Sequence, residues 1–212
     1  MHIPKQDTAG IEVLPFAEAL AAAETPRPDY DIARWLYVPP AYDEYRYVLG
    51  TRGTRPLICV GINPSTAAPD RLDPTLKSAQ RIALANGYDS FLMYNVYAQR
   101  ATRPDDMEKI PNEWLMDQNR QAFDYLLSLG ARGGEPPAVW AAWGSLIEKR
   151  PYLPACVGEL LRLADRWGAV WYHAGPLSKA GHPHHPLYLR ADTPLKPFDT
   201  EAYLERLAAA RV

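Results

Sequence analysis

The chain has 212 residues, of which 47% are hydrophobic, enough for a full core in one compact domain with modest additions. Its formal net charge of −2 argues against a protein that coats nucleic acid non-specifically, because such binding depends on cations that neutralise phosphates. Two cysteines, Cys59 and Cys156, cannot supply a disulfide framework, and no segment approaches the roughly 20 apolar residues of a membrane span.

Residues 1–44 are rich in alanine, proline and charge, and we interpret them as an N-terminal extension. Apolar residues at helical spacing predict one helix within it, over residues 13–23. Residues 45–49 predict an edge strand or hairpin arm whose aromatic side chains pack against a sheet. A single α/β domain is therefore expected over residues 45–212.

Four short apolar segments follow, at 57–61, 91–96, 138–143 and 169–174. Helical patterns lie between them, and strands that alternate with helices indicate a parallel sheet in α/β layers. The helices are expected from the Asp73-Pro74 pair to Asn86-Gly87, and over residues 114–129, 157–167 and 200–210.

The first of these strands ends abruptly in small and polar residues. Gly61 permits tight backbone geometry and Pro64 fixes one dihedral angle after Asn63, so a polar side chain is held rigidly at a strand end. Ligands bind beyond the carboxyl ends of strands in open parallel sheets. The candidate binding residues here are Gly61, Ile62, Asn63, Pro64, Ser65 and Thr66.

The second strand places Asn95 at its end. An amide offers both a donor and an acceptor, which suits the edge of a planar heterocycle, although satisfying a loop backbone is the alternative role. The third strand ends in Trp143-Gly144-Ser145, where glycine allows close approach and Ser145 is explained sufficiently as the cap of a short helix.

The fourth strand leads into a histidine-rich loop. Four of the five histidines lie between residues 173 and 185, and three prolines stiffen the loop over residues 175–188. Such a loop can hold an imidazole in a fixed orientation before any reaction begins.

A metal site is the rival interpretation of this cluster. His182, His184 and His185 could supply ligands, but no acidic residue follows at a familiar spacing and the HExxH pattern is absent. The chain also lacks the GxSxG elbow of serine hydrolases and the GxGxxG and GxxxxGK phosphate loops. We therefore predict no metal and no cofactor, and phosphoryl transfer is disfavoured.

Taken in order, GINPS at 61–65, LMYN at 92–95, WGS at 143–145 followed by Lys149-Arg150, and HPHHPL at 182–187 resemble the uracil-DNA glycosylase superfamily over about residues 55–190. The chain also resembles an uncharacterised bacterial and phage family with NPST, DPT and HPLYL signatures, which has no assigned activity. The glycosylase resemblance implies a three-layer α/β/α fold with a central four-stranded parallel sheet and a pocket for a base flipped out of DNA.

In terms of this resemblance, Asn63 would hold a water and Asn95 would read the base. His185 or His182 would donate to the oxygen that becomes anionic as the glycosidic bond breaks; we favour His185. Leu187 and Tyr188 resemble the apolar wedge that fills the vacated stack.

Two departures leave the preferred base open. The most active members have a carboxylate where this chain has Asn63, which implies a slower enzyme or a different base, and Ser65 replaces the expected aromatic residue or glycine. Asp73 could supply the missing carboxylate, although capping its helix explains it equally well.

These residues predict a DNA glycosylase-like hydrolase, acting in the cytoplasm on an unusual or mismatched base in DNA, single-stranded or modified. No membrane partner and no obligate protein partner are expected, and the N-terminus lacks the pattern of a secretory signal. Two alternatives stay open: a non-catalytic nucleic-acid or nucleotide-binding module, and a small-molecule hydrolase or transferase with His185 as general base.

Overall fold

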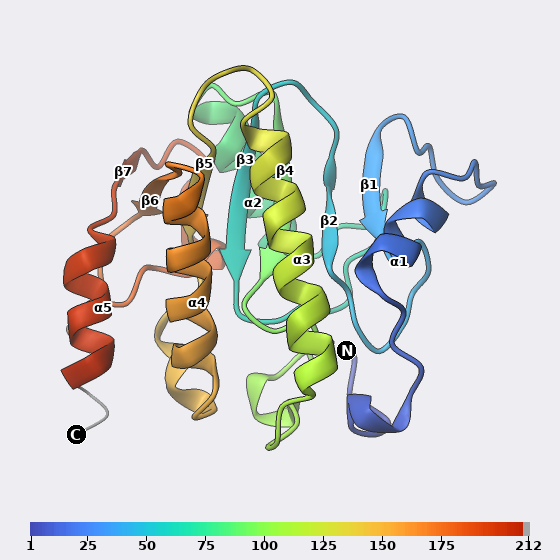
Figure 1. Cartoon of the computed structure of the whole chain (residues 1–212). Coiled ribbons are helices and arrows are strands. Elements are labelled where there is room, and N and C mark those ends of the chain that lie inside the picture. Colours follow the sequence, from blue (N-terminus) through green and yellow to red (C-terminus); the bar gives the residue numbers. More distant parts are fainter. Residues whose placement is uncertain (210–212) are drawn as a thin grey trace.

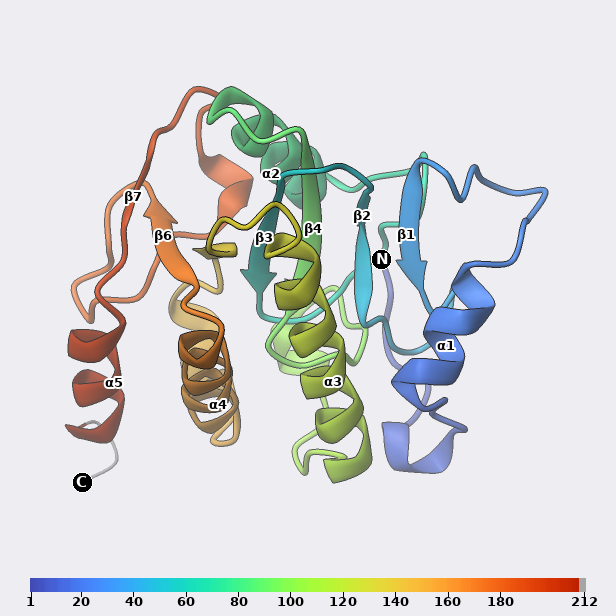
Figure 2. The ribbon, with the colours of Figure 1, turned by 45° about the horizontal axis from the view of Figure 1, so that its top comes forward.

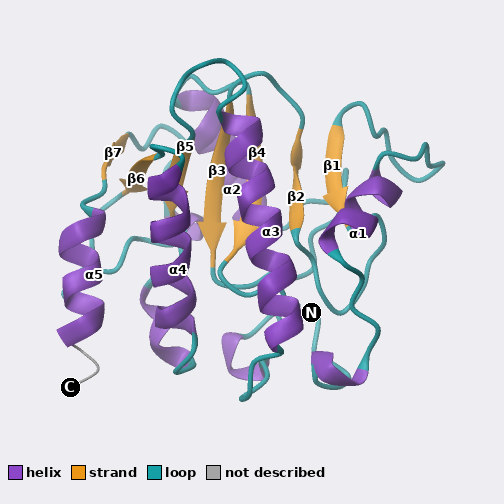
Figure 3. Ribbon diagram, in the orientation of Figure 1, coloured by secondary structure: helices purple, strands orange, loops and turns teal. Residues whose placement is uncertain are grey.

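The computed structural model describes residues 1–209 and contains one mixed sheet in the order β1-β2-β4-β3-β5-β6-β7 (Figures 1 and 3). The strands are β1 (Trp35–Val38), β2 (Val48–Thr51), β3 (Pro56–Gly61), β4 (Ser90–Asn95), β5 (Ala138–Ala141), β6 (Val170–Ala174) and β7 (Leu195–Pro197).

The four predicted central strands are present as β3, β4, β5 and β6, and they pair in parallel. The sheet has seven strands rather than the four expected, because β1, β2 and β7 add antiparallel strands at the two edges. β1 lies within the stretch 1–44 that we separated as an extension, so part of that stretch belongs to the sheet. This strand, Trp35–Val38, is only four residues long and all four residues are buried.

Helices cover both faces of the sheet, which makes three layers (Figures 1 and 2). One face packs against α1 (Phe16–Ala23), α3 (Glu113–Gly130), α4 (Leu153–Arg166) and α5 (Thr200–Ala209), and the other against α2 (Pro74–Ala85). Short 3₁₀ helices occupy Thr8–Gly10, Pro104–Asp106, Ser145–Lys149 and Pro186–Tyr188. Among residues 1–209, no helix combines the length and apolar character needed to cross a membrane.

The central position of β3 and β4 explains their sequences. Every residue of both strands is buried, because helices cover both sheet faces. This is why each strand reads as a continuous apolar run rather than an alternating one. The two strands are in register so that Gly61 lies beside Asn95 at their carboxyl ends.

The start of α2 is set by local chemistry that the sequence already indicated. Asp73 is the N-cap, with Oδ1 accepting a hydrogen bond from the backbone N–H of Leu76 at 2.9 Å, and Pro74 is the first helical residue. The helix therefore begins close to the strand ends and brings an acidic side chain there.

Candidate functional site

A cleft of about 340 Å³ lies at the carboxyl ends of β3 and β4. It collects residues from five separate parts of the chain: Arg46, Gly61, Ile62, Asn63, Ser65, Thr66, Asp73, Pro74, Thr75, Leu76, Met93, Asn95, Ala101, Thr102, Pro104, Leu146, His185 and Leu187. A larger and more open groove of about 1160 Å³ between α3 and α4 contains none of the predicted site residues. The cleft at the strand ends is therefore the candidate site.

The Asn63 amide is held by the segment that follows β4. Its Nδ2 donates to the carbonyl oxygens of Ala101 at 2.7 Å and of Pro64 at 3.1 Å. The Ala101 N–H in turn donates to the Pro64 carbonyl, which joins the two loops. With both N–H groups engaged, the amide orientation is fixed, and Oδ1 has no hydrogen-bond partner within residues 1–209. Asn63 thus presents an acceptor.

Asn95 is 1% exposed and its side-chain Nδ2 is buried without a hydrogen-bond partner in the described chain. The backbone around it is well satisfied, since Asn119 on α3 donates to the Asn95 carbonyl at 2.9 Å. Gly61 leaves room next to it, because a Cβ there would lie 3.0 Å from Asn95 Oδ1. An unpaired buried amide costs about 1–3 kcal/mol, so this side chain is suited to bind a ligand. Its alternative role, satisfying a loop backbone, is not the one observed.

His185 lines the same cleft, with a fixed ring orientation. The backbone N–H of Leu187 donates to its Nδ1 at 3.3 Å, so the neutral ring carries its proton on Nε2. Burial lowers the pKa of His185, and the His184 charge lowers it further, against the opposing effect of Asp73. The neutral ring with an Nε2–H donor is therefore the form favoured at neutral pH.

Two neighbours position the histidine loop. The hydroxyl of Ser78 on α2 donates to the Pro186 carbonyl at 2.7 Å. Gly144 has φ +67°, and the site of its absent Cβ lies 3.5 Å from the His185 Cβ. The backbone turn at Gly144 thus packs directly against His185.

Asp73 caps α2 and also lines the cleft, so its carboxylate lies at the candidate site. One oxygen caps α2, and the other has no hydrogen-bond partner among residues 1–209. It is the one carboxylate among the described residues that line the cleft.

Sequence reasoning missed Arg46, which is 1% exposed and lines the cleft. Residues 45–49 are expected to form an edge strand or hairpin arm; in the structure β2 begins at Val48 and pairs antiparallel with β1, and Tyr45 forms an isolated bridge with Gln99. The signal that could have found Arg46 is a charged residue inside a run of apolar and aromatic residues, where burial of the charge is costly.

Arg100 is buried beside the cleft. Its guanidinium donates to the carbonyls of Ser65 and Ala67 and, at 2.9 Å, to the Tyr37 hydroxyl. It also stacks over the Tyr42 ring, 4.2 Å from the centroid. Arg100 therefore holds the loop after β3 in place.

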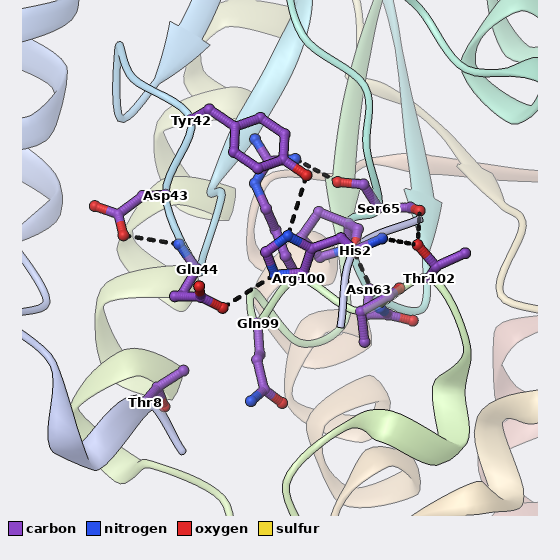
Figure 4. A network of polar contacts seen from close by, with 12 residues as sticks. His2, Thr8, Tyr42, Asp43, Glu44, Asn63, Ser65, Gln99, Arg100 and Thr102 are labelled. Atoms are coloured by element: carbon purple, nitrogen blue, oxygen red, sulfur yellow. Dashed lines mark hydrogen bonds and ion pairs between the residues drawn. The ribbon is translucent and has the colours of Figure 1, made fainter. Parts of the chain in front are cut away.

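The N-terminal segment contacts the cleft lining through Thr102 (Figure 4). The Thr102 Oγ1 accepts from the backbone N–H of His2 at 2.6 Å and lies 3.2 Å from the Ser65 hydroxyl. The His2 ring contacts Glu44 at 3.0 Å and the Tyr42 hydroxyl at 3.1 Å. Residues before the predicted domain thus contribute to the edge of the site.

Five predicted site residues do not line the cleft. His182 is buried elsewhere, with Nδ1 2.9 Å from the Tyr203 hydroxyl and Nε2 3.0 Å from Glu148. Ser145 is exposed and does not cap its helix, because Gly144 is the N-cap residue. The other three are Pro64, Gly144 and Tyr188. The Pro64 carbonyl accepts from Asn63, and Gly144 packs against His185, so both contact lining residues. Tyr188 is 85% exposed.

The ambiguity between the two histidines is therefore resolved geometrically in favour of His185 as the residue at the cleft. Within the part of the chain that the structure describes, no group of three or more His, Cys, Asp or Glu residues is arranged to hold a metal ion. Both cysteines are buried, and burial raises the pKa of each thiol.

The chain matches the model of a family described as a protein of unknown function, DUF1643, over residues 46–187, about two thirds of its length. The chain belongs to this family. The stretch shared with the DUF1643 model begins at Arg46 and ends at Leu187, and both residues line the cleft. No match was found among curated proteins or among solved structures.

Proposed function

We propose that this protein hydrolyses the N-glycosidic bond of an unusual or mismatched base flipped from DNA, as its resemblance to the uracil-DNA glycosylase superfamily implies. The observation that carries the proposal is the convergence of Asn63, Asn95 and His185 on one cleft. These residues follow three different strands, so the shared cleft is a property of the fold.

Each side chain has a role that its contacts support. Asn95 offers an unpaired amide to the edge of a planar base. His185 offers its Nε2–H to a base oxygen, which gains negative charge as the bond to the sugar breaks. These two groups act on the leaving base.

The opposite side of the reaction involves the sugar and a water. Asn63 and Asp73 both line the cleft, and in the proposed reaction the Oδ1 of Asn63 and the second carboxylate oxygen of Asp73, neither of which has a partner among residues 1–209, accept hydrogen bonds from the attacking water. The water oxygen bonds to the sugar carbon, the carbon–nitrogen bond breaks, and its electron pair leaves with the base. The water's proton goes to Asp73 and then to the departing base.

The geometry disfavours His185 as the general base of a small-molecule hydrolase. Its Nδ1 already accepts from the Leu187 backbone, and its remaining nitrogen carries the proton. A lowered pKa also makes the ring a weaker base.

A second candidate substrate is a free nucleoside or nucleotide. The lining of the cleft has one arginine and one aspartate among its described residues, and the arginine is buried, so the lining itself offers a small ligand one cation and one carboxylate. The exposed cations that a DNA backbone would need, Arg71, Lys77 and Arg103, lie outside the lining, close in the chain to residues that belong to it.

The test is incubation of the full-length protein with oligonucleotides that carry uracil, mismatched thymine or hydroxymethylated pyrimidines, and with the matching free deoxynucleosides and nucleotides. Abasic sites or free base are the expected product, and His185→Gln is expected to abolish most of it. Absence of free base from every substrate would contradict the proposed hydrolysis.

A further inference from the structure

Arg46 has a buried charge that the described chain does not compensate. Its side chain is 1% exposed, and its one hydrogen bond runs from Nη1 to the Ala67 carbonyl at 3.2 Å. Nε and Nη2 are buried without a partner. Among residues 1–209, no carboxylate oxygen lies within 4.0 Å of this guanidinium.

The neighbouring Arg100 shows how a structural arginine is held in the same region, although its Nε is also buried without a partner. Its two terminal nitrogens reach two backbone carbonyls and the Tyr37 hydroxyl, and its face covers the Tyr42 ring. Arg46 has none of these additional contacts. The proximity of a second cation raises the cost of burying Arg46, because like charges repel strongly where water is excluded.

The cleft adds two further features that suit an anion. The N-terminal turn of α2 lines it through Pro74, Thr75 and Leu76, and a helix N-terminus carries a partial positive charge. The buried Nδ2 of Asn95 is an unpaired donor in the same lining. Asp73 opposes an anion, but its Oδ1 is held at the helix end by Leu76.

We propose that the cleft binds a planar heterocyclic ligand that carries a negative charge, and that Arg46 binds the charged group while Asn95 binds the edge of the ring. A ligand anion would supply the missing counter-charge, and hydrogen bonds between a guanidinium and an anion are about twice as strong as neutral ones. The heterocycle in this proposal rests on the proposed function. The negative charge on the ligand is the new element.

The geometry of the cleft fits a negative charge from either of two chemical groups on the ligand. One is an acidic substituent on the ring, such as a carboxylate, and the other is the phosphate of a nucleoside monophosphate. Two matched pairs separate them: 5-carboxyuracil against thymine, and deoxyuridine monophosphate against deoxyuridine.

The experiment measures the affinity of the full-length protein for all four compounds by titration calorimetry. We expect the charged member of one pair to bind at least about tenfold more tightly than its neutral counterpart. Arg46→Met is expected to remove that preference and to leave the affinity for the neutral compound within about threefold. Arg81→Gln, which removes an exposed arginine from α2, is the matched control and should keep the preference.

Folding of the variant is checked by thermal melting without ligand. Because Arg46→Met removes an uncompensated buried charge, its midpoint should equal or exceed that of the parent. Arg46→Lys, which keeps the charge without the planar fork, should retain part of the preference.

Equal binding of charged and neutral compounds, binding of none of them, or an unchanged preference in Arg46→Met would overturn the proposal. Tight binding of a charged compound without cleavage of any substrate would support it while contradicting the proposed hydrolysis. Cleavage of a substrate, together with equal binding of charged and neutral compounds, would support the proposed hydrolysis and contradict the proposed binding of an anion.

Discussion

The backbone N–H of Leu187 donates to Nδ1 of His185, two residues earlier in the chain, and so determines which ring nitrogen carries the proton. The turn Pro186–Tyr188 makes this contact, and Ser78 of α2 anchors the turn through the Pro186 carbonyl. A short local turn therefore prepares the imidazole as a donor before any ligand enters the cleft.

The first prediction concerns catalysis by His185. In the proposed hydrolysis His185 donates to the leaving base, so His185→Gln is expected to lower the cleavage rate by about 10²–10³, the size seen when one such donor is removed. Single-turnover kinetics on the preferred substrate would measure it. A rate within threefold of the parent would show that His185 does not stabilise the leaving base.

The second prediction is a pH dependence of stability. Burial lowers the pKa of folded His185, so below the unfolded-state value of about 6.5 the unfolded chain binds more protons than the folded one. The contribution of His185 to stability is full above pH 6.5 and is lost as pH falls from there through the folded-state pKa. Denaturant unfolding at several pH values should show a shallower decline in His185→Gln than in the parent.

The third prediction separates ligand binding from folding at Asn95. Because Nδ2 is buried without a partner, Asn95→Ala removes an unsatisfied group as well as packing, and the free energy of unfolding should change by less than about 1 kcal/mol. Binding of the preferred base should nevertheless be lost. Thermal melting with and without ligand measures both quantities, and Asn119→Ala, which breaks the hydrogen bond to the Asn95 carbonyl, is the destabilising comparison.

The fourth prediction is that Asn63→Asp does not produce a faster enzyme. The substitution would place a carboxylate oxygen against the carbonyls of Ala101 and Pro64, which now accept from Nδ2. Two donated hydrogen bonds would become repulsive contacts, at a cost of about 1–3 kcal/mol in stability. Chemical denaturation should show the loss, and a rate increase with unchanged stability would contradict this account.

The fifth prediction assigns His182 a structural role. Its ring lies between the Tyr203 hydroxyl and Glu148 and is 4% exposed, so His182→Ala should lower the free energy of unfolding by about 1–3 kcal/mol. The corresponding fall in the melting midpoint is about 2–4 °C per kcal/mol for a chain of this size. The cleavage rate of the folded protein should stay close to the parent value, in contrast to His185→Gln.

Local signals predicted the elements on which the site is built. The apolar runs that became β3 and β4 were visible because strands covered on both faces need no polar residues. The Asp73-Pro74 start of α2 was visible because capping is local chemistry. The edge strands β1 and β7 were harder to predict, since they are only four and three residues long.

The sequence by itself determined that polar side chains follow buried parallel strands, and hence that Asn63, Asn95 and a histidine from the last loop were candidates. Tertiary structure alone decided which histidine faces the cleft, because His182 and His185 are three residues apart in one loop and differ only in what packs around them. It also brought Arg46 to the cleft wall. That the Arg46 charge is buried without a counter-charge can be seen only from the side chains packed around it. This packing forms only when the chain has folded.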